Sequence, residues 1–122
     1  MNKAIFARIS ALALVGVAAV TLASPASAAR CRDGQNRNVR IINETGAPIL
    51  RFFSTNVSAN AWGGDLLGRG VIPTGQSLVV NIDDGSCFCQ MDFKAVFNDD
   101  RPDAIRRRIN VCQVSTYRYY EN

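Results

Sequence analysis

Four cysteines are the residues of this 122-residue chain whose type and spacing could do chemistry. Cys87 and Cys89 are separated by a single residue, and this spacing would allow a redox pair or a site for a soft metal ion. No further cysteine, histidine or cluster of methionines accompanies them. An even number of cysteines in a small chain with an export signal is typical of a disulfide framework. We therefore predict two disulfides among Cys31, Cys87, Cys89 and Cys112.

Two disulfide pairings are compatible with the spacing. A bridge between Cys87 and Cys89 would close a strained ring within one strand. Either Cys89 joins Cys112 and Cys31 joins Cys87, or Cys87 joins Cys112 and Cys31 joins Cys89. Each bridge contributes about 2–4 kcal/mol to the free energy of unfolding, which is a large part of the net stability of a domain this small.

Acid–base and metal chemistry have few candidate residues. Histidine is absent, which removes the usual neutral-pH general base and the commonest metal ligand. Three acidic clusters could bind a divalent cation or supply a carboxylate pair for glycoside hydrolysis; they are Asp83-Asp84, Asp99-Asp100 with Asp103, and Asp65. They lack EF-hand spacing, so we interpret them as solvated turn residues and expect no metal and no cofactor. Serine nucleophiles likewise lack a G-x-S-x-G context.

A cationic and aromatic surface is the strongest candidate for binding. Arg106, Arg107 and Arg108 are consecutive, and in a strand the middle side chain points away from the other two. We interpret this run as a charged strand edge that discourages aggregation, with a contact surface for an anionic partner as the alternative. Arginine and aromatic residues are enriched at binding hot spots. The candidate surface comprises Trp62, Asp65, Arg106, Arg108, Tyr117 and Tyr119.

One glycine-rich segment, residues 60–68, breaks the strand pattern. Trp62 and Leu66 are four residues apart and could share a face of one helical turn, although three glycines exclude a long helix. We expect this segment to fold an apolar plug over one end of the strands. The alternatives are a stacking platform for a ligand, or a loop that an inhibitor inserts into a target enzyme.

The N-terminal residues 1–28 have the order of a secretory signal peptide. Two positive charges in residues 1–8 precede a 14-residue apolar run, 9–22, and a small-residue cleavage site ends at Ala28. The run is shorter than the ~20 residues that span a bilayer. The short, alanine-rich form is typical of bacteria. We therefore predict a secreted or periplasmic protein with a single domain over residues 29–122.

Five segments have the composition and alternation of short strands. Segments 39–42 and 49–55 flank a turn with glycine and proline, which predicts a hairpin. Segment 76–83 places Leu78, Val80 and Ile82 on one face. The remaining strand segments are 87–97 and 104–112, and a further strand is possible over the C-terminal tyrosines.

Segments 87–97 and 104–112 are predicted to pair around a polar loop. If they close about the midpoint of residues 100 and 101, Cys89 lies opposite Cys112, which favours the first disulfide pairing. The same register places Phe93 opposite Arg108 and turns the two apolar faces to opposite sides of the sheet. We therefore predict a one-residue bulge in this pair.

Around six or seven short strands without a long helix predict an all-β fold, a small antiparallel β-sandwich stabilised by disulfides. Without Lys3 and Arg8, the 14 basic residues become 12 against 10 acidic ones. The resulting charge of +2 does not favour nucleic acid as a partner. We expect a non-catalytic binding or accessory module whose partner is a protein or an anionic envelope glycan. A small carboxylate- or metal-dependent enzyme, or an inhibitor of a secreted or envelope enzyme, is the alternative.

Six short segments carry a resemblance to known proteins: NETG (43–46), WGGDLLG (62–68), PTGQS (73–77), DDG (83–85), CQMDFKAVF (89–97) and VC (111–112). On these segments the chain resembles a family of short exported bacterial β-domain proteins of unassigned function. The resemblance implies a compact β domain with a Cys89–Cys112 bridge, and Cys31 and Cys87 as an added pair. Some members carry the name argininosuccinate lyase. Those lyases are large helical enzymes with histidine among their acid–base groups, so we expect no such activity from this chain.

Overall fold

The computed structural model describes residues 30–121, so the predicted signal peptide lies outside the described residues. No helix in the described part of the chain has the length and apolar character that crossing a bilayer requires. Six strands run through it: β1 (Asn38–Glu44), β2 (Ile49–Asn56), β3 (Ser77–Asn81), β4 (Gln90–Phe97), β5 (Ala104–Asn110) and β6 (Thr116–Tyr120).

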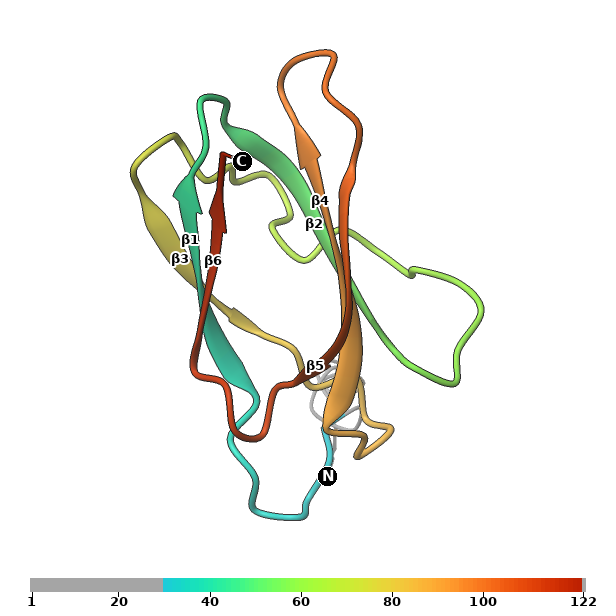
Figure 1. Cartoon of the computed structure of the whole chain (residues 1–122). Helices are drawn as coiled ribbons and strands as arrows, with labels where there is room; N and C mark the ends of the chain where they lie inside the picture. The colour runs from blue at the N-terminus through green and yellow to red at the C-terminus, as the bar shows by residue number, and fades with distance from the viewer. Residues whose placement is uncertain (1–29, 122) are drawn as a thin grey trace, which may run out of the picture. The chain divides into compact units, whose positions relative to one another are not determined.

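The strands form two three-stranded sheets that face each other, with the orders β3-β1-β6 and β2-β4-β5 (Figure 1). Their inner faces share one core, which includes Ile41, Phe52, Phe93 and Tyr119. The predicted all-β sandwich is confirmed. The pairing is not antiparallel throughout, because β6 runs parallel to β1. After β5 the chain leaves the β2-β4-β5 sheet and enters the β3-β1-β6 sheet. There β6 lies beside β1 and runs in the same direction as β1.

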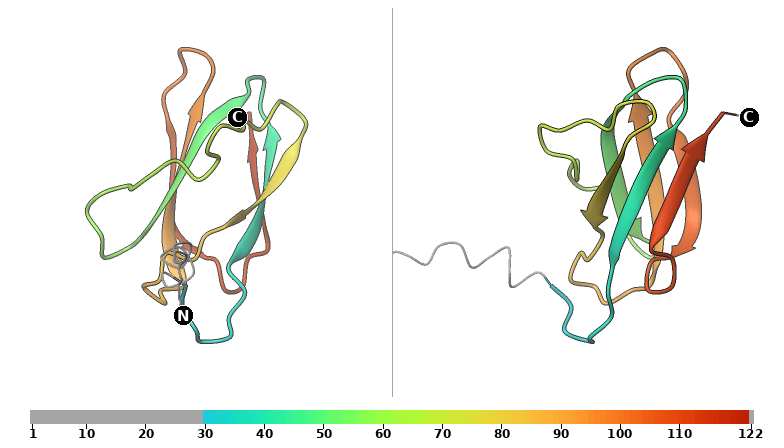
Figure 2. Two further views of the ribbon diagram at one scale, coloured as in Figure 1. Left: turned by 180° about the vertical axis from the view of Figure 1, so that it is seen from behind. Right: turned by 90° about the vertical axis from the view of Figure 1, so that its left-hand side faces the viewer.

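The predicted hairpin of segments 39–42 and 49–55 is wrong, because β1 and β2 belong to different sheets. The turn between them crosses from one layer to the other (Figure 2). The buried Asn43 side chain holds this crossing. Its amide donates to the carbonyls of Ala47 and Ile72, both at 2.9 Å, and its oxygen accepts from the Thr45 N–H at 3.0 Å and hydroxyl at 2.6 Å.

The strand alternation of β4 is confirmed, and that of β3 holds at one end only. Met91, Phe93, Ala95 and Phe97 are all buried, as their shared face predicts. In β3, Val80 is buried while Leu78 is largely exposed. The difference follows from position, because β3 is an edge strand and no strand of the described fold pairs with its outer side.

The predicted bulge between β4 and β5 is confirmed, but the register differs from the expected one. Arg107 and Arg108 together lie opposite Asp92, and Arg108 has a φ of 56°. Phe93 consequently lies opposite Arg106 rather than Arg108. The extra residue reverses the alternation along β5.

The reversal changes which side chains of β5 face the core. Ile109 is buried, as predicted, whereas Ile105 is exposed on the outer face. Arg106 takes the inward position instead, opposite the fully buried Phe93.

Both disulfides form in the first of the two predicted pairings, Cys31–Cys87 and Cys89–Cys112. Cys87 and Cys89 therefore belong to different bridges, which contradicts a redox pair or soft-metal site between them. Since all four sulfurs are bonded, the nearby carboxylate of Asp33 has no thiolate with which to hold a metal ion. The two disulfides are compatible with an oxidising compartment.

Candidate functional site

A shallow groove of about 420 Å³ opens on the side of the sandwich where β5 and β6 are the edge strands. We call it the β5/β6 groove. The β4–β5 loop and the end of β6 border it. Its lining combines cations, carboxylates and aromatic rings: Thr45, Phe97, Asp99, Arg101, Pro102, Ala104, Arg106, Tyr119, Tyr120 and Glu121.

Arg106 is the cation of this groove that the bulge brings into place. Its guanidinium carbon lies 5.5 Å from the ring centroid of Tyr119. Tyr117 packs edge-on against Tyr119 at 5.2 Å and against Phe93 at 5.4 Å. Within residues 30–121, no carboxylate lies within ion-pair distance of Arg106. One of its nitrogens, Nη1, donates to the Ile105 carbonyl at 3.0 Å. An aromatic platform therefore positions a guanidinium that has no carboxylate partner and keeps further N–H groups for a ligand.

The two tyrosines beside Arg106 are phenols rather than phenolates. Burial raises the pKa of Tyr117, although Arg106 opposes that effect. Burial, and then Tyr117, raise the pKa of Tyr119 far above its usual value. The Tyr119 hydroxyl is buried and has no hydrogen-bond partner among the described residues. Around Arg106 the groove therefore presents neutral tyrosine rings beside a cation.

The charged side chains at the rim of the groove pair with one another. Arg101 donates to Asp99 at 3.0 Å and to Glu121 at 3.2 Å, and its guanidinium lies over the Phe97 ring at 5.1 Å. Glu121 also accepts the Gly46 N–H, so a Cβ at Gly46 would lie only 2.9 Å from its carboxylate. Because Asp99 and Glu121 both pair with Arg101, they stabilise the rim. Arg106 is then the groove cation without a carboxylate partner.

The structure divides the predicted binding surface among several places. Arg106, Tyr117 and Tyr119 lie together at the β5/β6 groove. Arg108 sits in the bulge, where its backbone N–H donates to Asp92 at 3.0 Å. Trp62 and Asp65 belong to the long loop after β2, away from this groove.

Trp62 lies on the outer face of the β2-β4-β5 sheet and is not the predicted plug. The Lys94 ammonium lies 4.7 Å from the Phe53 ring and 5.1 Å from the Trp62 ring. The Arg107 guanidinium carbon lies 5.7 Å from the Trp62 ring centroid, and Arg107 pairs with Asp92 at 2.8 Å. These cations hold the loop down on the sheet and bury Asp92, which alternation alone places on an exposed face.

Leu67 supplies the apolar plug instead, since it is buried and Leu66 is exposed. Asp65 organises this part of the loop: one carboxylate oxygen accepts the N–H groups of Phe52 and Leu67, both at 2.9 Å. An aspartate side chain often accepts the backbone N–H two residues later and so forms a turn. The sequence Asp-Leu-Leu at 65–67 could therefore have predicted this turn. Asp65 is therefore a structural residue.

The three acidic clusters do not converge on one site. Asp83 accepts the Cys31 N–H at 2.9 Å, and Asp99 pairs with Arg101. Burial opposes ionisation of Asp84, but hydrogen bonds from Ser86 and Asn56 outweigh it and lower the pKa of this carboxyl. These contacts agree with the interpretation of the clusters as turn residues. The β5/β6 groove contains one residue of these clusters, Asp99.

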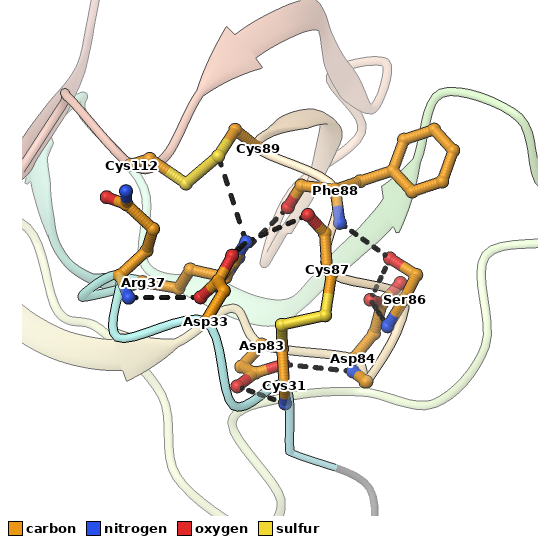
Figure 3. Close-up of a disulfide and its surroundings, with 12 residues drawn as sticks. Cys31, Asp33, Arg37, Asp83, Asp84, Ser86, Cys87, Phe88, Cys89 and Cys112 are labelled. Carbon is orange, nitrogen blue, oxygen red and sulfur yellow. Dashed lines mark hydrogen bonds and ion pairs between the residues drawn. A yellow bond between two sulfur atoms is a disulfide. The ribbon is translucent and has the colours of Figure 1, made fainter.

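Sequence reasoning missed the buried Arg37, which organises the disulfide end of the domain (Figure 3). Its guanidinium pairs with both oxygens of Asp33 at 2.8 and 2.9 Å. It also donates to the carbonyls of Cys87 and Phe88, both at 2.9 Å. An arginine in a polar arm gives no sequence signal of burial, because its partners are carbonyls from a segment fifty residues away.

The Arg37–Asp33 pair predicts a dependence of stability on acid pH. Hydrogen bonds from the Arg37 side chain and the Gln35 N–H hold the pKa of Asp33 well below 3.8. A carboxyl whose pKa falls on folding contributes stability above its unfolded pKa, and that contribution is lost as the pH falls through its folded pKa. Asp33→Asn should therefore show a shallower loss of unfolding free energy below about pH 4 than the unchanged protein.

Urea unfolding at a series of pH values measures this slope. Asp100→Asn, in the exposed β4–β5 loop, is the charge-matched control and should retain the original slope. Equal slopes for Asp33→Asn and the unchanged protein would contradict a stabilising ion pair.

A comparison of the chain with family models, curated proteins and solved structures found no match. The resemblance drawn from the sequence segments thus stays a prediction.

Proposed function

We propose that this protein is an exported, non-catalytic binding module that takes an anionic group of an envelope glycan into the β5/β6 groove. The predicted signal peptide and the two disulfides support the export step. The observation that carries the binding step is Arg106, which stacks on Tyr119 and has no carboxylate partner among the described residues. A guanidinium without a carboxylate partner matches phosphate or carboxylate groups. Tyr120, which also lines the groove and is 60% exposed, offers a ring to the apolar face of a sugar.

The alternatives are less well supported by the geometry. A carboxylate-dependent enzyme needs two carboxyl groups on either side of a substrate, whereas Asp99 and Glu121 at the groove are both paired with Arg101. An inhibitor that inserts the residue 62–68 loop needs that loop free, whereas Lys94 and Arg107 hold Trp62 against the sheet.

Binding is testable by NMR titration of isotope-labelled protein with glucose 1-phosphate, and with glucose as the neutral probe. We expect the phosphate, and not glucose, to shift the amide signals of Arg106, Tyr117 and Tyr119. Arg106→Gln should weaken this binding by about tenfold or more, because a charge-assisted hydrogen bond is lost.

Two further variants separate binding in the groove from a general charge effect and from binding at another surface. Arg51→Gln removes the same charge from an exposed position on β2 and should leave binding unchanged. Equal weakening by Arg51→Gln and Arg106→Gln would show that only overall charge matters. Loss of binding in Trp62→Ala alone would move the site to the outer face of the β2-β4-β5 sheet.

A further inference from the structure

Three of the four sheet edges in residues 30–121 are protected against pairing with another strand. The segment after residue 64 covers β2, where Ile49 and Ile72 exchange two hydrogen bonds of 2.9 Å and the Leu66 N–H donates to the Phe52 carbonyl. The β5 edge has three arginines and a bulge. The β6 edge contains a charged residue, Arg118. Charge, bulges and covering loops are the usual devices against edge pairing.

The β3 edge has none of these devices. Its sequence, Ser-Leu-Val-Val-Asn, contains no charge, proline or glycine. Leu78 is 41% exposed and Val79 47% exposed. The segment that covers β2, the edge strand of the other sheet on this side, adds Leu66, 41% exposed, and Val71, 46% exposed. The ribbon of this segment leads into β3 (Figure 2). We call these four residues the β3 strip, an apolar surface along the side of the sandwich opposite the β5/β6 groove.

The backbone of β3 is ready to accept another strand. At its two ends the Asn43 N–H donates to the Gln76 carbonyl and the Ile82 N–H donates to the Arg37 carbonyl, both at 2.9 Å. Backbone groups alternate in direction along an antiparallel strand. The even-numbered residues of β3 therefore face β1, and the N–H and C=O groups of Ser77, Val79 and Asn81 point to the open side.

We propose that two copies of this protein pair through their β3 edges, antiparallel about a two-fold axis at Val79. In this register Val79 lies opposite Val79 of the second copy, and Ser77 lies opposite Asn81. Every outward-pointing backbone group of the strand then gains a partner. The contact uses the same surface on both copies, so it closes as a dimer and does not propagate into a fibre.

The side chains of this register are self-complementary. Leu78 and Val80 point to the core side of the sheet, and the two-fold axis sets Leu78 of one copy beside Val80 of the other. The two Val79 side chains meet on the outer face. The pairing thus continues the apolar inner face from one copy to the next, which is the arrangement that stabilises neighbouring strands.

Charge also favours a second copy over an unrelated strand. The Ile72 carbonyl lies at the Gln76 end of β3, because Asn43 contacts both residues. Arg69 is three residues from Ile72 and so remains within about 11 Å of it. The other end of β3 runs into Asp83 and Asp84. Antiparallel pairing brings Arg69 of each copy toward Asp83 and Asp84 of the other.

Sedimentation velocity of the purified protein, at concentrations up to about 100 µM, tests this proposal. We expect a concentration-dependent dimer. Val79→Lys should raise its dissociation constant by about 30-fold or more, because two valines lose contact and two like charges meet at the axis. Ile105→Lys is the matched control, a 40% exposed residue on the opposite edge, and should leave the dimer intact. A monomer at every concentration, or equal loss in both variants, would overturn the proposal.

A cross-linking variant tests the register directly. Directly opposed residues that share hydrogen bonds have Cα atoms about 5.5 Å apart, within disulfide range. Val79→Cys should form a covalent dimer on oxidation, and Ile105→Cys should not. A native dimer in which Val79→Cys fails to cross-link would place the interface elsewhere and refute this one. The β3 strip and the β5/β6 groove lie on opposite sides, so either proposal can fail without the other.

Discussion

Replacing Cys31 and Cys87 with alanine is expected to lower the free energy of unfolding by about 4 kcal/mol, and replacing Cys89 and Cys112 by about 3 kcal/mol. The bridges span 56 and 23 positions of the chain, respectively. A longer closed loop restricts the unfolded chain more, so the bridge near the N-terminal arm should contribute more stability. Urea unfolding of the two double variants, followed by circular dichroism, measures both losses.

A free-thiol count by mass spectrometry of the unchanged protein is the control, and zero free thiols are expected before reduction. The reverse order of the two losses would contradict the loop-length argument. It would mean that the Arg37 contacts to Asp33, Cys87 and Phe88 hold the arm in place without its disulfide.

Asn43→Ala is expected to destabilise the fold by about 3 kcal/mol, because buried polar groups lose their partners. The Asn43 side chain is fully buried. Its removal leaves the Thr45 N–H without its acceptor and takes one of two donors from the Ile72 carbonyl, which keeps the Ile49 N–H. The same change loosens the crossing between the two sheets, so the apparent unfolding midpoint in urea should fall.

Asn38→Ala, at an exposed position of the same strand, is the matched control and should change stability by less than about 0.5 kcal/mol. Asn43→Asp keeps the acceptor that Thr45 uses but loses both amide donors. It should be no more stable than Asn43→Ala at neutral pH, because it also places a charge in the core. A loss below about 1 kcal/mol for Asn43→Ala would show that water replaces the side chain.

Local patterns were sufficient for much of the fold. The alternation of β4 defined its buried face, since side chains of a strand alternate between core and solvent. The conflict between the cysteine register and the apolar face of segment 104–112 required a bulge, and the bulge is present. The predicted division of four cysteines into Cys31–Cys87 and Cys89–Cys112 also holds. The β4 face, the bulge and the Cys89–Cys112 bridge depend on residues near in sequence or on one adjacent pair of strands, and the Cys31–Cys87 bridge then follows because only two cysteines remain.

The groove at β5 and β6 could be predicted only in part. Arg106, Tyr117 and Tyr119 were recognisable by residue type. Their meeting depends on the bulge position and on β6 joining β1 in parallel, which no local pattern specifies. Trp62 was placed at the strand ends by its apolar character, although its cationic neighbours come from β4 and β5.

The sequence by itself determined the strand content, the disulfide framework, the bulge and the lack of histidine chemistry, because these follow from residue type, spacing and short-range geometry. Only the tertiary structure decided which strands share a sheet, that Arg37 and Asn43 are buried, and that β3 has an unprotected edge. The reason is that a turn with glycine and proline can close a hairpin or cross between layers. The choice depends on long-range contacts such as those of Asn43 with Ile72.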